Sequence, residues 1–249
     1  MSIHILNGDS LWHHFPHQIA GDKLVMRECL MDGPVAASLE QELDLFYQDR
    51  VTFLSALSDE DISLERYVKE VGGVFEKIQS ITDHSNLYLW FEHDLFCQVN
   101  CWFILWLIAR DTSHDYHAWM VHPKEEEPYS FAAHTTDELV HAFEHAQPVT
   151  ELEQLGKLWP AFCNQDNQRL VTLAHALEST YPFLMPAIQA HLDRQTTDES
   201  PGRPIQTLMQ IKQSSPEASF GEIFQEFSRR EGIYGMGDLQ VQQLLRSHT

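Results

Sequence analysis

Short apolar runs alternate with longer amphipathic segments along the first half of the chain. The runs are of strand length and end in turn-forming or charged residues; they cover 2–7, 23–28, 87–91 and 116–122. Apolar residues at helical spacing predict helices between them, over 38–57, 62–78 and 94–109. A short helix, capped by Ser10, is expected after the first strand. Strands joined through helices need crossover connections, so the pattern predicts a Rossmann-like α/β fold with a mostly parallel sheet of about four or more strands.

The segment 94–109 differs from the other predicted helices in its pattern. Leu95, Trp102, Trp106 and their apolar neighbours spread over most of its circumference rather than over one stripe. A helix that is apolar all round cannot face water on any side. We therefore predict that it is the central buried helix of the fold.

After residue 123 the strand pattern gives way to helical spacing. The predicted helices cover 137–146, 151–162, 167–179 and 186–194, and the polar stretch 195–204 is typical of a linker. Ser219 and Glu222 form a capping box that opens a helix over 220–230, and a last helix follows Gly235. We expect an α/β domain at 1–123, a helical region packed on it at 124–200, and a small helical domain at 201–249. The last region is typical of either a helix-turn-helix unit or a plain helical hairpin.

The composition narrows the classes of partner. Lys and Arg number 16 against 37 Asp and Glu, a net charge of −21. Such a surface repels phosphate backbones and anionic lipid, which argues against nucleic-acid or membrane binding and weakens the helix-turn-helix interpretation. The N-terminus has no signal-peptide pattern, and the four cysteines form no disulfide-like framework. We expect a cytoplasmic protein with reduced thiols; the composition does not indicate its oligomeric state.

Polar residues gather where three of the predicted strands end. In open parallel sheets, ligands bind at this edge, at the point where the strand order reverses. Arg27 is the candidate clamp for an anion, and His93 is a candidate proton shuttle. Asp9, Glu92 and Asp94 are candidates for a general base or for binding Mg²⁺. The full strand-end set is Asn7, Gly8, Asp9, Ser10, Arg27, Glu28, Glu92, His93 and Asp94. The alternative is structural: Asp9, Ser10 and Asp94 cap helices, and Arg27 pairs with Glu28 or Glu92.

Two other motifs carry weaker signals. Residues 8–11 spell Gly-Asp-Ser-Leu, as in an esterase superfamily, but the Gly-x-Asn-Asp and late Asp-x-x-His motifs of that superfamily are missing. His141 and His145 stand one helical turn apart, and His93 shares a helical face with Cys97 and Cys101. Neither set has a nearby partner that would complete a zinc site, so we assign no metal to them.

Several of these motifs together resemble a bacterial family catalogued as domain of unknown function 1835. The resemblance covers roughly residues 1–122 and rests on Ile5–Ser10, the run 25–35, Arg50 with Phe53, and residues 89–98. The segment 202–238 looks like the companion C-terminal domain of unknown function 3658. Carried over position by position, the family pattern points to Asn7, Gly8, Asp9, Ser10, Arg27, Glu28, Gly33, Pro34, Arg50, Glu92, His93, Asp94 and Gln98.

Two functional hypotheses follow from the sequence. The first is a protein that binds, and turns over, a small anionic metabolite such as a nucleotide or phosphosugar at the strand ends, with Arg27, Arg50 and Gln98 among its binding residues. The second is a non-catalytic regulatory or protein-interaction module, in which the ligand reorients the C-terminal helices toward a partner. The resemblance supplies no reaction, and no cofactor other than Mg²⁺ is indicated.

Overall fold

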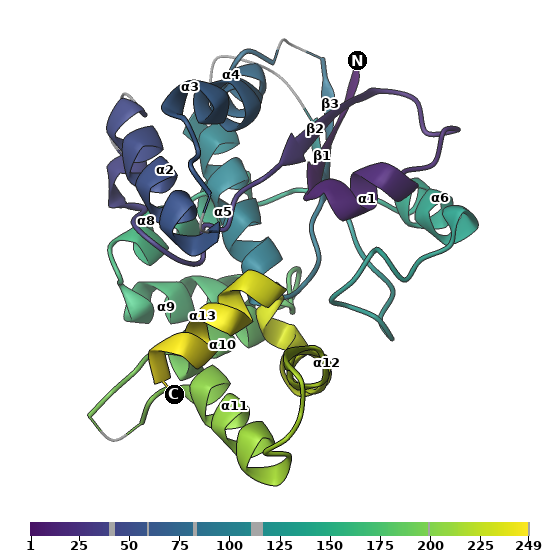
Figure 1. Ribbon diagram of the computed structural model, residues 1–249. Coiled ribbons are helices and arrows are strands. Elements are labelled where there is room, and N and C mark those ends of the chain that lie inside the picture. The colour runs from purple at the N-terminus through teal and green to yellow at the C-terminus, as the bar shows by residue number, and fades with distance from the viewer. Residues whose placement is uncertain (40–42, 59, 82–83, 111–116, 199, 249) are drawn as a thin grey trace.

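A mostly parallel sheet forms the centre of the molecule and confirms the predicted α/β class. The computed structural model describes residues 1–39, 43–58, 60–81, 84–110, 117–198 and 200–248 (Figure 1). The strands are β1 (Ser2–Asn7), β2 (Asp22–Met26), β3 (Asn86–Trp90), β4 (His117–Val121) and β5 (Gln147–Pro148). Their order is β2-β1-β3-β4-β5, with β1 to β4 parallel and β5 antiparallel at the edge. The four predicted strands are confirmed, Tyr116 of the fourth lying outside the described residues, whereas β5 was not predicted.

Thirteen α-helices occupy the described part of the chain. Their bounds are α1 (Asp9–His14), α2 (Asp44–Ser58), α3 (Leu64–Tyr67), α4 (Gly73–Gln79), α5 (Leu95–Arg110), α6 (Thr136–Glu144), α7 (Leu152–Leu155), α8 (Leu158–Cys163), α9 (Asn167–Leu177), α10 (Leu184–Asp193), α11 (Arg203–Ser214), α12 (Phe220–Glu231) and α13 (Asp238–His248). Two 3₁₀ turns, Ala36–Leu39 and Gly232–Tyr234, join them.

Three of the predicted helix bounds were wrong, two of them because glycine lets another element approach the backbone. The helix predicted over 62–78 is split by the π-turn Val68–Gly72, where a Cβ on Gly72 would lie 3.2 Å from the Tyr47 ring. The helix predicted over 151–162 is two helices, and a Cβ on Gly156 between them would lie 2.8 Å from Ala109 of α5. Over 38–57, the 3₁₀ turn and α2 replace one helix, with residues 40–42 outside the described part of the chain.

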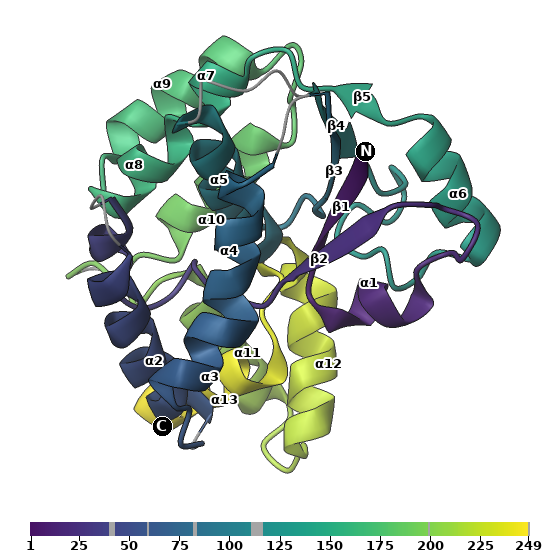
Figure 2. The same cartoon turned by 90° about the horizontal axis from the view of Figure 1, so that it is seen from above.

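The two faces of the sheet pack against different layers, as Figure 2 shows from above. Side chains alternate along each strand, so Ile3 and Ile5 point to one face while Leu6 points to the other. The first face packs against α4, α5 and the helices that follow β5. The second face packs against α1, α6 and Phe131.

Helix α5 is the central helix, as predicted. Every residue from Cys97 to Ile108 is buried. It contacts α4 on one side and α7, α8 and α10 on others. None of the described helices is both long enough and apolar enough to cross a membrane.

The C-terminal helices have a small core of their own and also join the main one. Leu208, Ile223, Phe227 and Val241 pack together between α11, α12 and α13. The predicted capping box of Ser219 and Glu222 opens α12. Tyr234, which follows α12, is fully buried in the large core beneath α5 and α10. The polar stretch at 195–204, expected as a linker, is shorter than predicted, because α11 begins at Arg203.

Candidate functional site

The strand order reverses between β1 and β3, because β1 leads to β2 on one side and β3 lies on the other. The carboxyl ends of β1 and β3 are therefore the place where an open parallel sheet binds a ligand. The predicted strand-end residues do not form one cleft there. They separate into a surface ion pair, a buried ion pair and a buried acidic cluster.

The surface ion pair joins Arg27 to Asp9. The guanidinium donates from Nε and Nη2 to the Asp9 carboxylate at 2.7–3.0 Å, and the side chains are 40% and 47% exposed. The arginine hydrogen bonds lower the pKa of Asp9. The Arg27 guanidinium, predicted to bind an anionic ligand, already binds a carboxylate of this chain. Its partner is Asp9, and not Glu28 or Glu92 as the structural alternative proposed.

The turn between β1 and α1 is made by glycine. Gly8 has φ +82°, donates its N–H to the Met26 carbonyl at 2.9 Å, and stands at the position before α1. Ser10 lies inside the first turn of α1, where no side chain caps the helix, so its prediction as the cap was wrong. Ser10 contributes only its carbonyl, which lies 2.8 Å from Nδ1 of His14.

The buried ion pair joins Glu28 to Arg50. Both side chains are fully buried, and the guanidinium donates to both carboxylate oxygens, at 2.7 and 3.2 Å. Tyr67 donates its hydroxyl to the same carboxylate, and the remaining Arg50 donors reach the carbonyls of Cys29, Asp32 and Pro34. Because every group of this pair has a partner within the chain, it fastens the loop after β2 to α2 and does not present a charge to a ligand.

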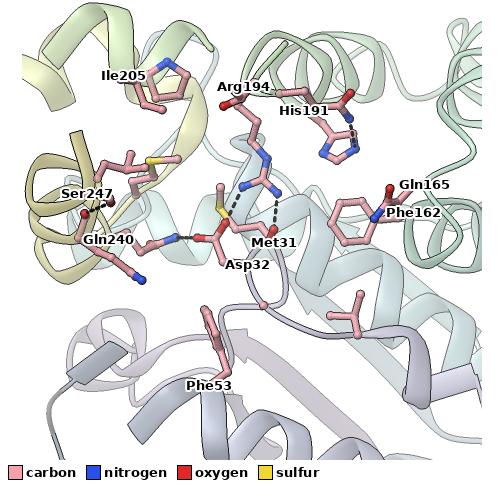
Figure 3. A pocket seen from close by; sticks show the side chains of 18 of the residues that line it. Met31, Asp32, Phe53, Phe162, Gln165, His191, Arg194, Ile205, Gln240 and Ser247 are labelled. Atoms are coloured by element: carbon pink, nitrogen blue, oxygen red, sulfur yellow. Dashed lines mark hydrogen bonds and ion pairs between the residues drawn. The ribbon is translucent and has the colours of Figure 1, made fainter. Parts of the chain in front are cut away.

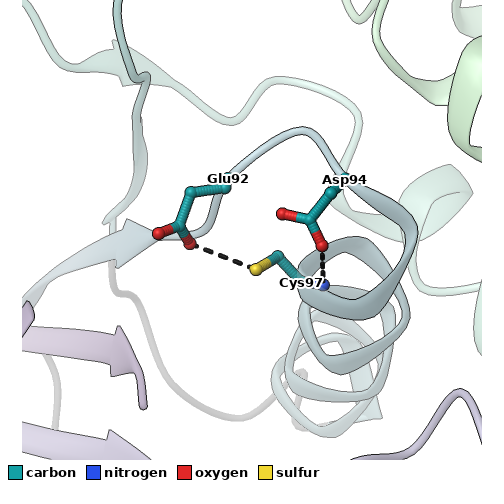
Figure 4. Close-up of side chains that lie close together, drawn as sticks. All are labelled: Glu92, Asp94 and Cys97. Atoms are coloured by element: carbon teal, nitrogen blue, oxygen red, sulfur yellow. Dashed lines mark hydrogen bonds between the residues drawn. The ribbon is translucent and has the colours of Figure 1, made fainter. Parts of the chain in front are cut away.

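The acidic cluster consists of Glu92, Asp94 and Cys97, drawn in Figure 4. Asp94 accepts the backbone N–H of Cys97 at 2.9 Å and so caps α5, which agrees with the structural alternative for this residue. The Cys97 thiol donates to Glu92 at 3.1 Å, and the other Glu92 oxygen accepts the N–H of Phe131 at 3.2 Å. Burial raises the pKa of both carboxyl groups, that of Asp94 to about 7, and raises that of the thiol well above its usual value.

Three amide side chains lock this cluster to the sheet. Asn7 donates to the Cys97 sulfur at 2.9 Å and accepts from Asn100, which also donates to the Glu28 carbonyl at 2.7 Å. Gln98 donates to the Glu92 carbonyl at 2.8 Å. The predicted residues Asn7, Glu92, Asp94 and Gln98 thus come together, but as a network that is satisfied within the protein.

The C-terminal region closes this network from outside. Gly235 has φ +60°, and a Cβ there would lie 1.9 Å from Oδ1 of Asp94. Only a glycine allows the backbone to approach the carboxyl group this closely. The end of the sheet where a ligand was expected is therefore covered by the segment that joins α12 to α13.

Metal ligation at this point is limited to the same three side chains. One ligand atom each of Glu92, Asp94 and Cys97 lie within 4.8 Å of one another, the only such group among the described residues. Asp9, predicted as a third oxygen ligand, is held elsewhere by Arg27. A thiol suits Zn²⁺ better than Mg²⁺, which prefers oxygen, so the Mg²⁺ expectation does not match this donor set.

The remaining two predicted residues line cavities. His93 faces a hollow beside the ends of β3 and β4. Gly33, with φ +78° and the Phe53 ring against it, lines a cavity of about 760 Å³, which we call the junction cavity. Its wall is built from the loop after β2, from α8 and α10 with the residues after them, and from α13, so all three regions of the chain meet there (Figure 3).

Asp32 is the central polar residue of the junction cavity. One carboxylate oxygen accepts Nη1 of Arg194 at 2.6 Å, and the other accepts Nε2 of Gln240 at 2.6 Å (Figure 3). Arg194 also donates to the Met31 carbonyl. Asp32 thus connects the sheet edge to the end of α10 and to α13.

Apart from Asp32 and Arg194, the lining mixes apolar side chains with neutral polar ones. Burial lowers the pKa of His191 to about 4, so its imidazole is neutral at pH 7. Its Nδ1 is buried without a partner among the described residues. The lining contains two phenyl rings, Phe53 and Phe162, and a set of amides and hydroxyls: Gln165, Asn167, Gln195, Thr196, Gln240, Gln243 and Ser247.

Sequence reasoning missed these residues almost entirely. Asp32 was included only within the run 25–35, Arg194 was the end of a predicted helix, and Gln240 was not singled out. Nothing in their spacing of 162 and 208 positions from Asp32 signals that they meet. The unusual number of amides on α13 is the one signal that could have drawn attention to this surface.

The fold defines an α/β protein with a mostly parallel sheet and a C-terminal helical region whose Gly235 lies against Asp94, beyond the end of β3. Comparison of the chain with protein-family models, with curated proteins and with solved structures found no match in any of the three. The resemblance to domains of unknown function 1835 and 3658 therefore stays a prediction.

Proposed function

We propose that this protein is a non-catalytic module that binds a small polyhydroxylated metabolite, a sugar or sugar monophosphate, in the junction cavity. The observation that carries the proposal is the double hold on Asp32 by Arg194 and Gln240. Through it, a ligand in the cavity touches the sheet edge, α10 and α13 at once. Binding is thereby coupled to the position of the C-terminal helices.

The lining supports this class of ligand. A sugar hydroxyl both donates and accepts hydrogen bonds, and an amide side chain offers both functions in a fixed plane. Phe53 and Phe162 contribute apolar carbon atoms to the wall, against which the C–H groups of a sugar can pack. A volume of about 760 Å³ falls in the range of pockets for small ligands.

The charges restrict the ligand to at most one phosphate. Among the described lining residues, Arg194 is the single guanidinium, and it is shared with Asp32. Its side chain is 18% exposed, so a phosphate can reach it beside the carboxylate. A nucleoside triphosphate would bring several more charges into a strongly acidic protein without further cations to meet them.

The same lining supports binding rather than turnover. Asp32 is its only carboxylate among the described residues, and both of its oxygens accept hydrogen bonds from the protein. Hydrolysis of a glycosidic bond, for comparison, typically uses two carboxyl groups placed on either side of that bond.

Calorimetric titration with glucose 6-phosphate, ribose 5-phosphate and the free sugars tests the proposal, together with hydrogen exchange along α13. Binding should slow hydrogen exchange in α13. The substitution Gln243→Leu should weaken the binding affinity roughly tenfold, because it removes one polar contact with the ligand. Gln242→Leu is the matched control, because Gln242 lies next to it on the same helix but outside the cavity lining. The proposal fails if none of these compounds binds, or if binding leaves α13 exchange unchanged.

A further inference from the structure

A second hollow lies at the carboxyl ends of β3 and β4, apart from the junction cavity. Its volume is about 980 Å³, and it is walled by α6, by the loop 123–134 and by the turn 179–183. We call it the histidine groove, because His93, His122, His134, His141 and His145 all line it. The backbone N–H of His93 donates to the Pro128 carbonyl at 2.9 Å, and this bond holds the loop 123–134 against the end of β3.

The floor of the groove is a pair of hydrogen-bonded imidazoles. Nε2 of His93 lies 3.1 Å from Nδ1 of His122, and the two rings meet edge to face. The Phe183 ring stacks flat on His93, with centroids 4.3 Å apart and an angle of 7°. Both imidazoles are therefore held in fixed orientations.

The hydrogen bond between the rings leaves one further nitrogen on each, Nδ1 of His93 and Nε2 of His122, which we call the outer nitrogens. It assigns opposite hydrogen-bonding roles to these two atoms. Burial lowers the pKa of both histidines, that of His93 to about 4, so both rings are neutral at pH 7. A neutral imidazole has one N–H and one lone pair. The ring that donates to the other keeps a lone pair on its outer nitrogen, and the ring that accepts keeps an N–H. Nδ1 of His93 and Nε2 of His122 have no partner among the described residues, so the pair offers one donor and one acceptor.

The rest of the groove selects against negative charge. Its one ammonium, Lys124, is paired with Glu138 and lies 4.0 Å from Glu127. Glu125 and Asp137 add further carboxylates to the lining. An anionic ligand would meet uncompensated like charge there. The apolar part of the wall consists of Ala142, the ring of Phe183 and three prolines.

We propose that the histidine groove binds an uncharged planar heterocycle, such as a nucleobase or nicotinamide, whose polar edge forms a hydrogen bond with the free ring nitrogen of His93 or of His122. The ring of the ligand packs against the apolar part of the wall, and its polar edge forms a hydrogen bond with the histidine pair. The proposal does not depend on the junction cavity, which takes a different class of ligand.

The test is a titration of the whole protein with uracil, hypoxanthine and nicotinamide, followed by NMR of the protein labelled with ¹⁵N-histidine. We expect binding of at least one of the three, with shifts of the side-chain nitrogens of His93 and His122. The compound 1,3-dimethyluracil, whose methyl groups block both N–H donors, should bind roughly tenfold or more weakly than uracil.

Substitutions locate the site. His122→Phe keeps an aromatic ring but removes the nitrogens, and it should weaken binding roughly tenfold, whereas His17→Phe at an exposed position should not. If His122→Phe does not fold, the nitrogen shifts in the wild-type protein decide. The proposal is overturned if none of the three compounds binds, if a charged amine or a sugar phosphate displaces them as the preferred ligand, or if binding leaves the nitrogens of both histidines unchanged.

Discussion

Two groups of carboxyl side chains follow β2 and β3, the strands on either side of β1, and their partners differ. Glu28, beyond β2, meets the guanidinium of Arg50 in a fully buried pair. Glu92 and Asp94, beyond β3, meet each other and a thiol, and no cation contributes to the pKa of either. Glu28 thus has a cation as its partner, whereas burial raises the pKa of Glu92 and Asp94, and the neighbouring Glu92 raises that of Asp94 further.

The comparison shows that burial alone does not decide what a carboxylate does. Both groups lie beneath protein, and both accept backbone N–H groups, from Cys29 in one case and from Phe131 and Cys97 in the other. They differ in their neighbours: Arg50 lies beside Glu28, whereas Glu92 and Asp94 lie beside each other. The four predictions below separate the two cases, beginning with the largest expected effect.

Arg50→Met should lower the free energy of unfolding by about 3–5 kcal/mol, because it leaves Glu28 charged and buried without its cation. Denaturant unfolding at pH 7 measures the loss. The double substitution Glu28→Gln with Arg50→Met removes both charges and should recover a large part of it. A loss below about 1 kcal/mol for the single variant would show that Glu28 does not need this partner.

Asp94→Asn should remove part of the pH dependence of stability. Asp94 ionises near pH 4 in the unfolded chain but near pH 7 in the folded one. Between these values the folded protein holds a proton on Asp94 that the unfolded chain has lost. The contribution of Asp94 to the free energy of unfolding is therefore greatest below about pH 4 and falls as the pH rises to about 7. The slope due to this group reaches about 1.4 kcal/mol per pH unit.

Unfolding curves from pH 4 to 8 test this prediction, with the exposed Asp61→Asn as the matched control. The free energy of unfolding should depend on pH in the same way for the wild-type and Asp61→Asn proteins. That of the Asp94→Asn protein should rise relative to both as the pH increases from 4 to 7. Asparagine keeps the oxygen that caps α5, so the comparison isolates the charge. Three parallel curves would mean that Asp94 ionises at its ordinary value.

Gly235→Ala should lower the free energy of unfolding by about 1–3 kcal/mol, because its methyl group would overlap Oδ1 of Asp94 and force a shift of the segment that covers the cluster. Gly221→Ala is the control: a Cβ there meets nothing within 4 Å, and alanine favours a helix. Thermal unfolding of the two variants side by side checks the difference. Equal melting temperatures would show that Gly235 does not contact the acidic cluster.

Arg27→Gln should change the free energy of unfolding by less than about 1 kcal/mol, since the pair with Asp9 is exposed to water. Salt should reduce even this difference. Unfolding at low and high ionic strength measures it. A loss comparable to that of Arg50→Met would contradict the distinction between the surface pair and the buried pair.

The fold class and the central helix were predictable, because each depends on a pattern within a short stretch of chain. Alternating strands and helices indicated the parallel sheet, and the apolar circumference of residues 94–109 indicated its buried position. The strand-end residues Asn7, Glu92 and Asp94 were also brought together as expected. Their partners were not predicted: Cys97 was considered as a metal ligand, yet its thiol donates to Glu92 and accepts from the Asn7 amide.

The sequence by itself determined the four parallel strands and several of the helices, since these depend on residues a few positions apart. The capping box of Ser219 and Glu222 is an example. Only the tertiary structure decided which charges are paired and which surfaces are covered. Arg27 forms an ion pair with Asp9, and Arg50 forms one with Glu28. Asp32 accepts hydrogen bonds from Arg194 and Gln240. Gly235 lies against Asp94. Electrostatic energy depends on distance and burial in space, and neither is encoded in the local spacing of residues along the chain.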